Sequence, residues 1–366
     1  MQKIFFDHQK FSTQKFGGIS RYFANIIEEI KKNKDFDYLL GVANSQNFYI
    51  KNEKQFLNNP VANYLLKSEY GFRTFKTNEL YCKYLLKQNN FDVFHPTYYD
   101  PYFIKSLKKP MVTTIHDMTY ERLPEYFWVQ DPLTAYKRVS AQRADKIIAI
   151  SETTKRDLLT YLEVDESKVE VIYHGIDIDS PLQLEEVESL PADYLFFVGD
   201  RGGYKNFYLM LDAFANLSKK HPNLHLVLSG GGKLVGADVE IISRLKLNEK
   251  VHHHQVNDAQ LNYLYKHALL FIYPSLYEGF GLPILEAFRA NCAILLSDID
   301  CFREIAQESA AFFDRYSLED LTQKIDDLIS HKSLRDNLVE KGKQRLKDFP
   351  IEKSMNQTLQ LYKSLT

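Results

Sequence analysis

Two glutamates, Glu278 and Glu286, are the residues of this sequence whose type and spacing point most directly to chemistry. They lie in the segment FIYPSLYEGFGLPILEAF, whose pattern predicts a buried strand, then a loop, then a helix. Gly279 and Gly281 would let the backbone of that loop approach a ligand closely. Free N–H groups at the start of the helix attract an anion, and the two carboxylates can accept hydrogen bonds from sugar hydroxyls. The segment therefore predicts a binding site that suits a sugar.

The same two glutamates also have a purely structural interpretation. Glu286, expected in the first turn of the helix, would then only complement the positive end of the helix dipole. Glu278 would be a solvated acid on a loop, and Pro283 would simply suit the first helical turn. Either glutamate taken alone would favour this structural interpretation, so the binding hypothesis depends on the whole segment.

The elements that must position this segment belong to an alternating α/β pattern. Short β-branched and aromatic runs alternate with longer amphipathic stretches, which is typical of parallel sheets covered on both faces. The expected strands are residues 3–6, 38–42, 91–94, 111–115, 146–150, 169–173, 194–198, 224–228, 269–273 and 293–296, and the clearest helices are 19–30, 206–217 and about 351–365. Ser151 is expected to cap a further helix, with Glu152 in its first turn.

The pattern restarts after an acidic, proline-flanked stretch, which predicts two domains. A chain of 366 residues is also long enough for two. We expect a Rossmann-like N-terminal domain over 1–178, a linker at 179–191 and a second Rossmann-like domain over 192–350. The last segment, 351–366, is expected to pack back on the first domain. Two such doubly wound domains would enclose a cleft at the carboxyl ends of their strands.

The glutamate segment closely resembles a known family signature. Residues 274–287 read P-S-x-x-E-G-F-G-L-P-x-L-E-A, which is similar to the signature of glycosyltransferase family 4, retaining enzymes of the GT-B fold. The resemblance implies that Glu286 binds the ribose hydroxyls of a nucleotide sugar. It also implies that Glu278 and the following backbone hold the sugar hydroxyls and the phosphate. The expected donor-binding set on this segment is Glu278, Gly279, Phe280, Gly281, Leu282 and Glu286.

Three other segments resemble the family in the same order along the chain. In FVGDRGGYKN the resemblance implies that Arg201 and Lys205 bind the donor diphosphate. Fixed cations there would stabilise the charge that develops on a departing diphosphate. Gly17 and Gly18, before the first long helix, resemble the family's glycine loop beside the diphosphate. His116, in the pair His-Asp after a strand, would face the transferred sugar. The expected catalytic set is therefore Glu278, His116, Arg201 and Lys205.

Further motifs narrow the resemblance and also depart from it. Ser151 and the pair His174–Gly175 match family positions near the cleft and hinge. The runs HPTYY, TIHDM and RGGYKN resemble a mannosyltransferase-like subgroup of O-antigen, lipopolysaccharide and capsule synthesis. Residues 252–256 read HHHQV where the family usually has a glycine. That loop lies near the nucleotide base in the family, so the sequence leaves UDP and GDP both open.

We expect the protein to use a nucleotide-sugar donor as substrate and to need no cofactor or metal ion. In a strand only His252 and His254 of the three adjacent histidines would share a face, and no acidic residue is spaced to join them. Asp298 and Asp300 have the spacing of a metal–diphosphate motif, but their context resembles a family loop. The resemblance therefore favours a metal-independent transferase in which Arg201 and Lys205 neutralise the charge.

Composition and charge exclude several other classes of protein. Hydrophobic residues make up 45% and charged residues 26%, which is typical of a globular chain, and 15 Gly with 12 Pro exclude a collagen-like one. Three cysteines without ligand spacing argue against a disulfide scaffold or a zinc ribbon. A net charge of −2 gives no footprint for nucleic acid. The absence of a signal peptide or an apolar span in this sequence predicts a cytoplasmic protein.

The first 110 residues carry 17 Lys and Arg against 10 Asp and Glu. Aromatic residues are dense there, as in the run from Tyr70 to Phe75 and again from Tyr81 to Tyr84. This combination suits peripheral contact with an anionic membrane, here the inner membrane surface. The alternative interpretation is a solvated helix face whose aromatic residues lie in the core.

The function predicted from the sequence is retaining transfer of a hexose, mannose favoured. The donor would be a UDP- or GDP-linked sugar, and the acceptor a glycan or lipid-linked oligosaccharide of surface polysaccharide synthesis. The resemblance implies that the N-terminal domain holds the acceptor and the C-terminal domain the nucleotide sugar. Two alternatives stay open at this point. One is a GT-B epimerase that hydrolyses its nucleotide sugar, and the other is a non-enzymatic two-domain sugar-binding protein.

Overall fold

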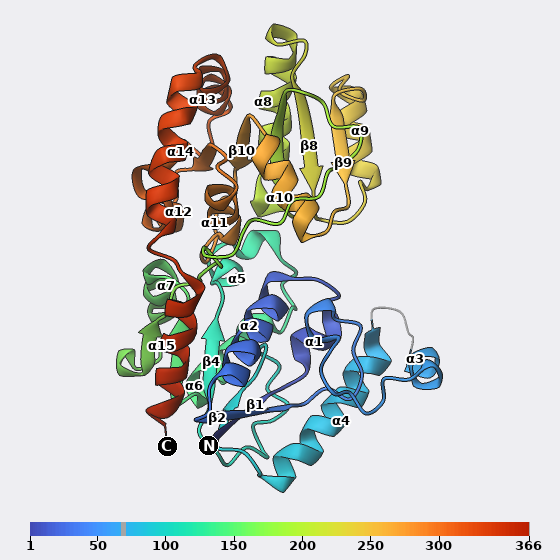
Figure 1. Ribbon diagram of the computed structural model, residues 1–366, viewed down its shortest axis with the longest axis vertical. Coiled ribbons are helices and arrows are strands. Elements are labelled where there is room, and N and C mark those ends of the chain that lie inside the picture. Colours follow the sequence, from blue (N-terminus) through green and yellow to red (C-terminus); the bar gives the residue numbers. More distant parts are fainter. Residues whose placement is uncertain (67–70, 366) are drawn as a thin grey trace. The chain divides into compact units, whose positions relative to one another are not determined.

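A computed structural model describes residues 1–66 and 71–365, and these divide into two compact units (Figure 1). The first unit comprises Met1–Glu121, Phe127–Tyr173 and Glu352–Thr366, and the second comprises Arg122–Tyr126 and His174–Ile351. Tyr70, part of one predicted aromatic cluster, lies outside the described residues. No described helix is both long enough and apolar enough to span a membrane.

The second unit is built on a parallel sheet with the strand order β12-β11-β10-β7-β8-β9. Its strands are β7 (Tyr194–Val198), β8 (His225–Ser229), β9 (Val251–His254), β10 (Leu270–Tyr273), β11 (Ile294–Ser297) and β12 (Ala311–Phe313). From β7 the chain first adds β8 and β9 on one side and then crosses to add β10, β11 and β12 on the other. The order therefore reverses between β7 and β10, and such a switch point is the usual ligand position in this kind of sheet.

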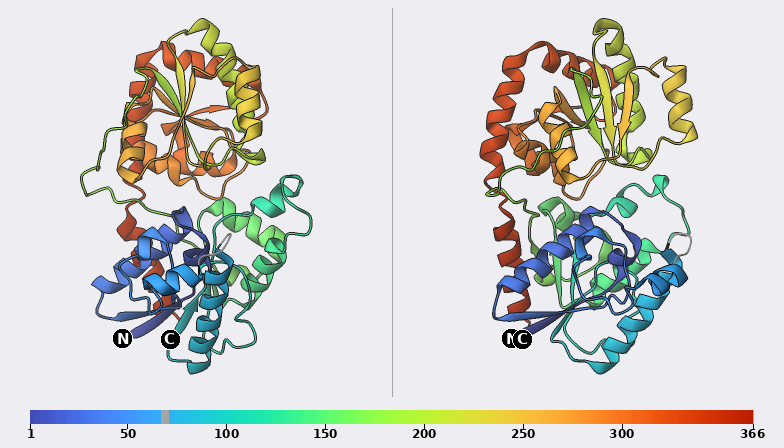
Figure 2. Two further views of the ribbon diagram at one scale, coloured as in Figure 1. Left: turned by 90° about the vertical axis from the view of Figure 1, so that its right-hand side faces the viewer. Right: turned by 45° about the vertical axis from the view of Figure 1, so that its right-hand side comes forward.

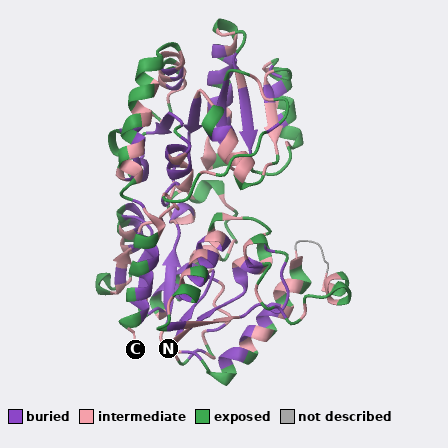
Figure 3. Ribbon diagram, viewed as in Figure 1, coloured by how far each residue is buried: buried purple, intermediate pink, exposed green. Residues whose placement is uncertain are grey.

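Helices cover both faces of this second sheet (Figure 2). They are α8 (Phe207–Lys220), α9 (Gly236–Arg244), α10 (Asp258–His267), α11 (Leu282–Arg289), α12 (Asp300–Ala306), α13 (Leu318–Ser330) and α14 (Lys332–Leu346), with 3-10 turns at Gly203–Lys205 and Gln307–Ser309. The strands β7, β10 and β11 are buried on both faces, which is why they read as nearly continuous apolar runs (Figure 3). The predicted strand 194–198 matches β7. Neither β9, which reads VHHH, nor the three-residue β12 was among the predicted strands.

The first unit contains two three-stranded parallel sheets, β2-β1-β3 and β4-β5-β6. Their strands are β1 (Gln2–Phe6), β2 (Phe36–Leu40), β3 (Val93–His95), β4 (Val112–Ile115), β5 (Lys146–Ala149) and β6 (Val169–Val171). A parallel bridge between Phe94 and Met111 links the two sheets. In the sheet β2-β1-β3 the chain first adds β2 on one side of β1 and then β3 on the other. The strand order therefore reverses between β1 and β3, and the first unit has a switch point of its own. The predicted strand 38–42 is displaced by two residues from β2.

The helices of the first unit include two that the sequence predicted, at 19–30 and after Ser151. They are α1 (Gln9–Thr13), α2 (Gly18–Lys32), α3 (Pro60–Leu66), α4 (Phe72–Gln88), α5 (Thr119–Arg122, whose last residue joins the second unit), α6 (Leu133–Arg143) and α7 (Glu152–Leu162), with 3-10 turns at Phe48–Ile50, Pro124–Tyr126 and Glu166–Lys168. Ser151 caps α7 as predicted, since its side chain accepts a hydrogen bond from the Thr154 N–H, 2.9 Å away. The amphipathic stretch 19–30 forms α2, whose apolar face is buried.

The C-terminal helix α15 (Ile351–Lys363) packs on the first unit, although the chain reaches it from the second. The Tyr362 hydroxyl lies 2.6 Å from Nδ1 of His95 at the end of β3. Just before α15 the chain runs beside the segment that leaves the first unit, because Ile176 and Pro350 form a parallel bridge. A Cβ on Gly175 would lie 2.6 Å from backbone atoms of Pro350 and Ile351, so this close pairing requires a glycine.

Candidate functional site

The loops after β7 and β10 meet at the switch point of the second sheet. The Leu276 N–H donates to the Tyr204 carbonyl at 2.7 Å, which joins the two loops through their backbones. Beside this bond, Nζ of Lys205 lies 2.5 Å from Oε1 of Glu278. Two residues that the sequence assigned separately to the diphosphate and to the sugar are therefore an ion pair in the structure.

The Lys205–Glu278 pair is shielded from water and electrostatically tight. The Lys205 side chain is 15% exposed and the Glu278 side chain 14%. Burial acts to lower the pKa of Lys205, but the Glu278 carboxylate outweighs burial and the net pKa is raised. The Lys205 ammonium also lies 4.9 Å from the centre of the Tyr204 ring. A fixed positive charge is therefore held at the position where this fold usually binds ligands.

Glu286 occupies a different environment from Glu278. It is buried and begins the second turn of α11, so its predicted place in the first turn is wrong. The difference arises because α11 starts at Leu282, after Gly281 has turned the backbone through a φ of 99°. The hydroxyl of the fully buried Tyr265 donates to Oε2 of Glu286 at 3.3 Å. Pro283 lies in the first turn as predicted.

Arg201 is directed into the protein. Its Nε lies 2.9 Å from Oδ2 of Asp238, and both side chains are almost fully buried. The guanidinium also donates to the carbonyls of Gly230, Gly231, Gly232 and Lys233 at 2.8 to 3.2 Å. Burial acts to raise the pKa of Asp238, but the Val235 N–H and Arg201 lower it further than burial raises it. Arg201 thus holds the loop after β8, and its predicted contact with the donor diphosphate stays a prediction.

That glycine loop takes a conformation open mainly to glycine. Gly230, Gly231 and Gly232 all have positive φ values, of 79°, 64° and 70°. His253 on β9 supports the same loop, since its Nε2 lies 3.1 Å from the Gly230 carbonyl. The unusual histidine run therefore packs beside the loop that Arg201 holds.

One histidine of this run also contacts a histidine on the neighbouring strand. Nε2 of His252 lies 2.9 Å from Nδ1 of His225 on the neighbouring strand β8. Over residues 1–66 and 71–365, no three His, Cys, Asp or Glu side chains are grouped closely enough to hold a metal ion. Asp298 is engaged by Arg303 through two hydrogen bonds of 2.7 Å each.

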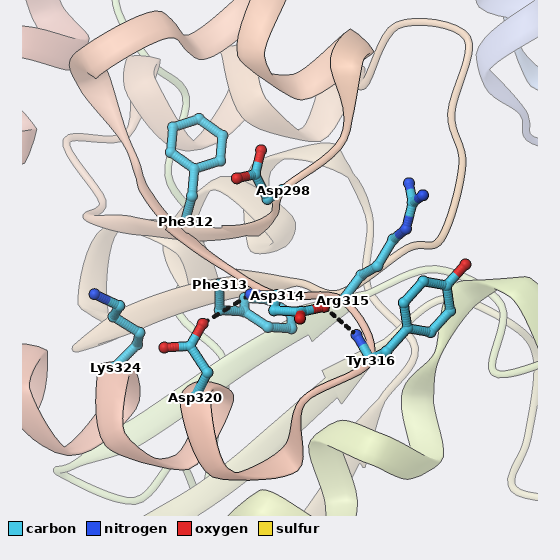
Figure 4. A pocket seen from close by; sticks show the side chains of 8 residues that line it. All are labelled: Asp298, Phe312, Phe313, Asp314, Arg315, Tyr316, Asp320 and Lys324. Atoms are coloured by element: carbon cyan, nitrogen blue, oxygen red, sulfur yellow. Dashed lines mark hydrogen bonds between the residues drawn. The ribbon is translucent and has the colours of Figure 1, made fainter.

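A hollow lies at the carboxyl ends of β11 and β12 (Figure 4). Its volume is about 530 Å³, and Asp298, Asp314 and Arg315 are among the residues that line it. Arg315 connects this hollow to the switch point. Its Nη1 donates to the Leu276 carbonyl at 3.4 Å, and its own carbonyl accepts from Asn206 at 2.8 Å.

The remaining predicted residues, Gly17, Gly18 and His116, belong to the first unit. Gly17 precedes α2 with an extended backbone, and Gly18 is the first residue of that helix. His116 follows β4, is buried, and packs edge-on against the Tyr22 ring with 5.6 Å between ring centres. Their roles toward the donor stay predictions from the family resemblance.

Comparison with known proteins gives a glycosyltransferase family model for each part of the chain. Residues 185–345 match the family model described as glycosyl transferases group 1, and residues 16–180 match the model described as glycosyltransferase family 4. This chain belongs to the family 4, group 1 glycosyltransferases.

Individual relatives of this glycosyltransferase are distant. It is 27% identical over 207 residues to the O-antigen chain mannosyltransferase RfbU of Salmonella typhimurium, a match that covers 56% of this chain and 57% of the relative. It is 24% identical over 287 residues to O-antigen chain mannosyltransferase B of Escherichia coli, covering 75% and 74%. The first of these alignments therefore spans a little over half of the relative's length.

Solved structures establish the fold of this glycosyltransferase. Anabaena HepE in complex with UDP and glucose superposes with a TM-score of 0.77 at 16% identity, covering 100% of both chains. WaaG, a glycosyltransferase involved in lipopolysaccharide biosynthesis, superposes with a TM-score of 0.71 at 15% identity, covering 100% of this chain and 99% of the other. The architecture is GT-B, as predicted.

Several residues of this glycosyltransferase's site were missed by the sequence analysis. Asp238 and Tyr265 hold Arg201 and Glu286, but each lies on a helix whose sequence carries no motif. The segment Arg122–Tyr126 belongs to the second unit, and the Arg122 guanidinium lies 5.9 Å from the centre of the Tyr277 ring. The signature that contains Tyr277 and Glu278 indicated where the site lies. It could not indicate which residues pair with it, because those residues are far away in the sequence.

Proposed function

We propose that this glycosyltransferase moves a hexose, mannose favoured, from a nucleotide-diphosphate sugar to a glycan or lipid-linked acceptor. The transfer would retain the anomeric configuration and serve the synthesis of a surface polysaccharide. The observation that carries the proposal is the shielded Lys205–Glu278 pair at the switch point of the second sheet. The relatives named as O-antigen mannosyltransferases support mannose, and HepE with bound UDP and glucose supports a nucleotide sugar.

The proposed chemistry assigns one task to each charged residue. The Lys205 ammonium stabilises the negative charge that develops on the leaving diphosphate, the kind of interaction that lowers a barrier most in a shielded site. Glu278 holds the ammonium in place and accepts hydrogen bonds from the sugar hydroxyls. Glu286 accepts from the ribose hydroxyls. Since Lys205 supplies the positive charge, we propose that the transfer needs no metal ion.

The proposed transfer uses no protein nucleophile. The acceptor hydroxyl attacks the anomeric carbon from the face that the diphosphate leaves, and the leaving phosphate oxygen takes the acceptor proton. The bond to the diphosphate breaks and the new glycosidic bond forms on the same face of the anomeric carbon, so the configuration is kept. Arg201 contributes indirectly, because it fixes the glycine loop after β8.

A thermal-shift panel tests the donor site. The panel contains UDP, GDP, ADP, UDP-glucose, UDP-N-acetylglucosamine and GDP-mannose, measured on the wild type and on Glu286→Ala. A nucleotide at about 100 times its dissociation constant stabilises the protein by about 2.7 kcal/mol. We expect one nucleotide family to raise the melting temperature of the wild type but not of Glu286→Ala. Glu308→Ala removes an exposed glutamate of the same unit and should respond like the wild type.

Turnover assays separate transfer from the two alternatives. A hydrolase or epimerase would release free sugar from the donor at an undiminished rate without acceptor, whereas a transferase should need acceptor for its main rate. A sugar-binding protein without enzymatic activity would turn over no donor at all. If no nucleotide shifts the melting temperature and no donor is consumed with acceptor present, the proposed function is wrong.

Peripheral contact with the inner membrane surface forms a further part of the proposal. Val61, Tyr64 and Leu65 on α3 and Phe72 on α4 are exposed apolar side chains in the basic first unit. Aromatic and aliphatic side chains beside lysines suit a bilayer interface. Sedimentation with vesicles containing about one third anionic lipid tests this contact. A protein that stays in the supernatant at low salt would rule it out.

A further inference from the structure

The second unit contains five residues, Arg122–Tyr126, that are continuous on both sides with chain of the first unit. We call this segment the strap. It ends in the 3-10 turn Pro124–Tyr126, where the Tyr126 N–H donates to the Leu123 carbonyl at 3.1 Å and Pro124 has a fixed φ. This local structure keeps the strap stiff, so it can hold a side chain in one place.

The residues next to the strap are firmly held within the first unit. Nζ of Lys137 lies 2.9 Å from Oε2 of Glu121, and both side chains are almost fully buried. The Phe127 ring stacks on the Tyr120 ring, with 3.7 Å between the ring centres. The strap is therefore a short segment between two anchored residues, and few conformations are open to it.

Tyr126, at one end of the strap, packs directly on the turn that carries Lys205. A Cβ on Gly203, the first residue of that turn, would overlap Cδ1 of the Tyr126 ring and lie 3.1 Å from its Cε1. The ring thus lies against the backbone of Gly203 and leaves no room for a side chain there. Gly203 also has a φ of 21°, which L-residues rarely adopt.

The chain before Lys205 needs such a contact because it consists of two glycines. Gly202 and Gly203 have more backbone freedom than any other residues would have. Within the described ranges 1–66 and 71–365, a Cβ on Gly202 would face open space. The backbone bond from Leu276 to Tyr204 fixes the far end of the turn, and the Tyr126 ring covers the near end. The position of the Lys205 ammonium therefore depends on Tyr126.

Arg122, at the other end of the strap, reaches the loop after β10. Its guanidinium lies 5.9 Å from the centre of the Tyr277 ring, and Tyr277 directly precedes Glu278 in the chain. The strap thus contacts both loops that supply the Lys205–Glu278 ion pair, one loop from each of its ends.

The exposure of Tyr126 separates this contact from ordinary core packing. Its side chain is 42% exposed, so it contributes little to the core of the second unit. Its removal should therefore leave the unit folded and change the glycine turn that the ring covers.

We propose that Tyr126 is a positioning residue for sugar transfer, which sets the place of the Lys205 ammonium by confining the glycine turn before it. Tyr126 itself does not contact the donor. Its effect on transfer rests on the function proposed above for Lys205, whereas the confinement of the turn follows from the packing alone. Since carbon atoms of the ring make the contact, phenylalanine should serve as well as tyrosine.

Hydrogen exchange read by mass spectrometry on the full chain tests the confinement without any substrate. The N–H groups of Lys205 and Asn206 are hydrogen-bonded within the turn, so peptides over 199–206 report on it. These peptides should exchange about tenfold faster in Tyr126→Ala than in the wild type, because the turn opens more often. Tyr126→Phe should match the wild type. So should the control Trp128→Ala, which removes another exposed ring two residues further along the chain.

The proposal is overturned if Tyr126→Ala leaves this exchange unchanged. It is also overturned if Tyr126→Phe exchanges as fast as Tyr126→Ala, because the ring would then not be the part that confines the turn.

Steady-state kinetics test the effect on transfer. Tyr126→Ala should lower kcat about tenfold and change the acceptor KM less than about twofold, because a displaced ammonium stabilises the leaving group less well. Tyr126→Phe and Trp128→Ala should keep the wild-type kcat. An unchanged kcat in Tyr126→Ala would overturn the positioning role. A wild type that consumes no donor with acceptor present would instead refute the proposed function, and the exchange result would still decide whether Tyr126 confines the turn.

A double substitution shows whether Tyr126 acts through Gly203. Gly203→Ala places a Cβ against the ring and displaces the turn, so it should also lower kcat about tenfold. Once the turn is displaced, adding Tyr126→Ala should cause no further loss, since the two residues share one contact. Losses that multiply to about 100-fold would mean that the two residues act independently, and would overturn the proposal.

Discussion

The two units place their switch points in the same kind of sheet but fill them with different chemistry. In the second unit, the loops after β7 and β10 are joined by the ion pair between Lys205 and Glu278. In the first unit, the loops after β1 and β3 line a pocket in which the Lys10 ammonium lies over the Tyr98 ring. Topology thus determines where a ligand can bind, and the loop residues determine which ligand that is.

The difference between the switch points is one of charge compensation. Under the proposed function, Glu278 holds the Lys205 ammonium where it contacts the donor diphosphate. Lys10 lines its pocket together with Asp100, Asp131 and aromatic side chains. Burial lowers the pKa of Lys10 to about 8, although Asp117 acts to raise it. The following predictions test this comparison, from the largest expected effect to the smallest.

Replacing Lys205 should have the largest effect on catalysis. Lys205→Ala removes the cation proposed to stabilise the leaving diphosphate, and the loss of one such interaction lowers kcat about 100- to 1,000-fold. Lys341→Ala, which removes an exposed lysine of the same unit, is the control and should keep full activity. Steady-state transfer kinetics provide the measurement. If Lys205→Ala changes kcat less than fivefold, the switch point of the second unit does not carry the chemistry.

Replacing Arg201 should lower the unfolding free energy of the protein more than it lowers the rate of transfer. Arg201→Met leaves the buried Asp238 without its ion-pair partner, which costs about 3 kcal/mol of unfolding free energy. Arg201→Met combined with Asp238→Asn should recover part of that loss, since the uncompensated charge is gone. Urea unfolding measures both. A stable Arg201→Met protein with strongly reduced nucleotide affinity would instead favour direct contact between Arg201 and the diphosphate.

Acid should weaken the first unit through its buried histidines. Burial lowers the pKa of His95 to about 3 and that of His8 to about 4. Below about pH 6.5 the unfolded chain binds protons that the folded chain does not, so the unfolding free energy falls as the pH falls. At pH 5 the loss is about 2 kcal/mol for each histidine.

Hydrogen exchange read by mass spectrometry at pH 7 and pH 5 resolves the units separately. His95→Gln should reduce the loss in the first unit, while His331→Gln, at an exposed position of the second unit, should not. Equal acid sensitivity of wild type and His95→Gln would show that other groups dominate.

The smallest expected effect is a difference in stability between substitutions at two glycines that precede helices, Gly281 and Gly17. Gly281 has a φ of 99°, and a Cβ there would lie 3.1 Å from Ile284 and Phe302 atoms. Gly281→Ala should therefore cost about 1 to 2 kcal/mol. Gly17 is extended, and the atoms nearest to a Cβ there belong to the amide end of the Gln14 side chain, which can rotate away at the cost of its hydrogen bond from the Ser20 N–H. Gly17→Ala should cost about 0.5 kcal/mol or less. Chemical denaturation distinguishes the two, and equal losses would contradict this account.

Much of the fold could be read from the chain because strong local signals agree with the tertiary structure. The run Tyr194–Val198 is apolar throughout and forms a strand buried on both faces, and Ser151 caps α7. Weak signals failed for physical reasons. The strand β12 is too short to show a period, and β2 begins two residues early because its pairing with β1 sets its register. The start of α11 depends on the turn at Gly281, which displaced the expected place of Glu286.

The sequence by itself determined the family, the two α/β units and the segment that carries Glu278 and Glu286. Spacing and residue type suffice for these, because each is written within one stretch of chain. Only the tertiary structure decided which side chains are partners: Lys205 with Glu278, Arg201 with Asp238, and Lys10 with Tyr98. The physical reason is that parallel strands far apart in sequence end at one edge of a sheet. Charges meet there according to strand order, which no local pattern records.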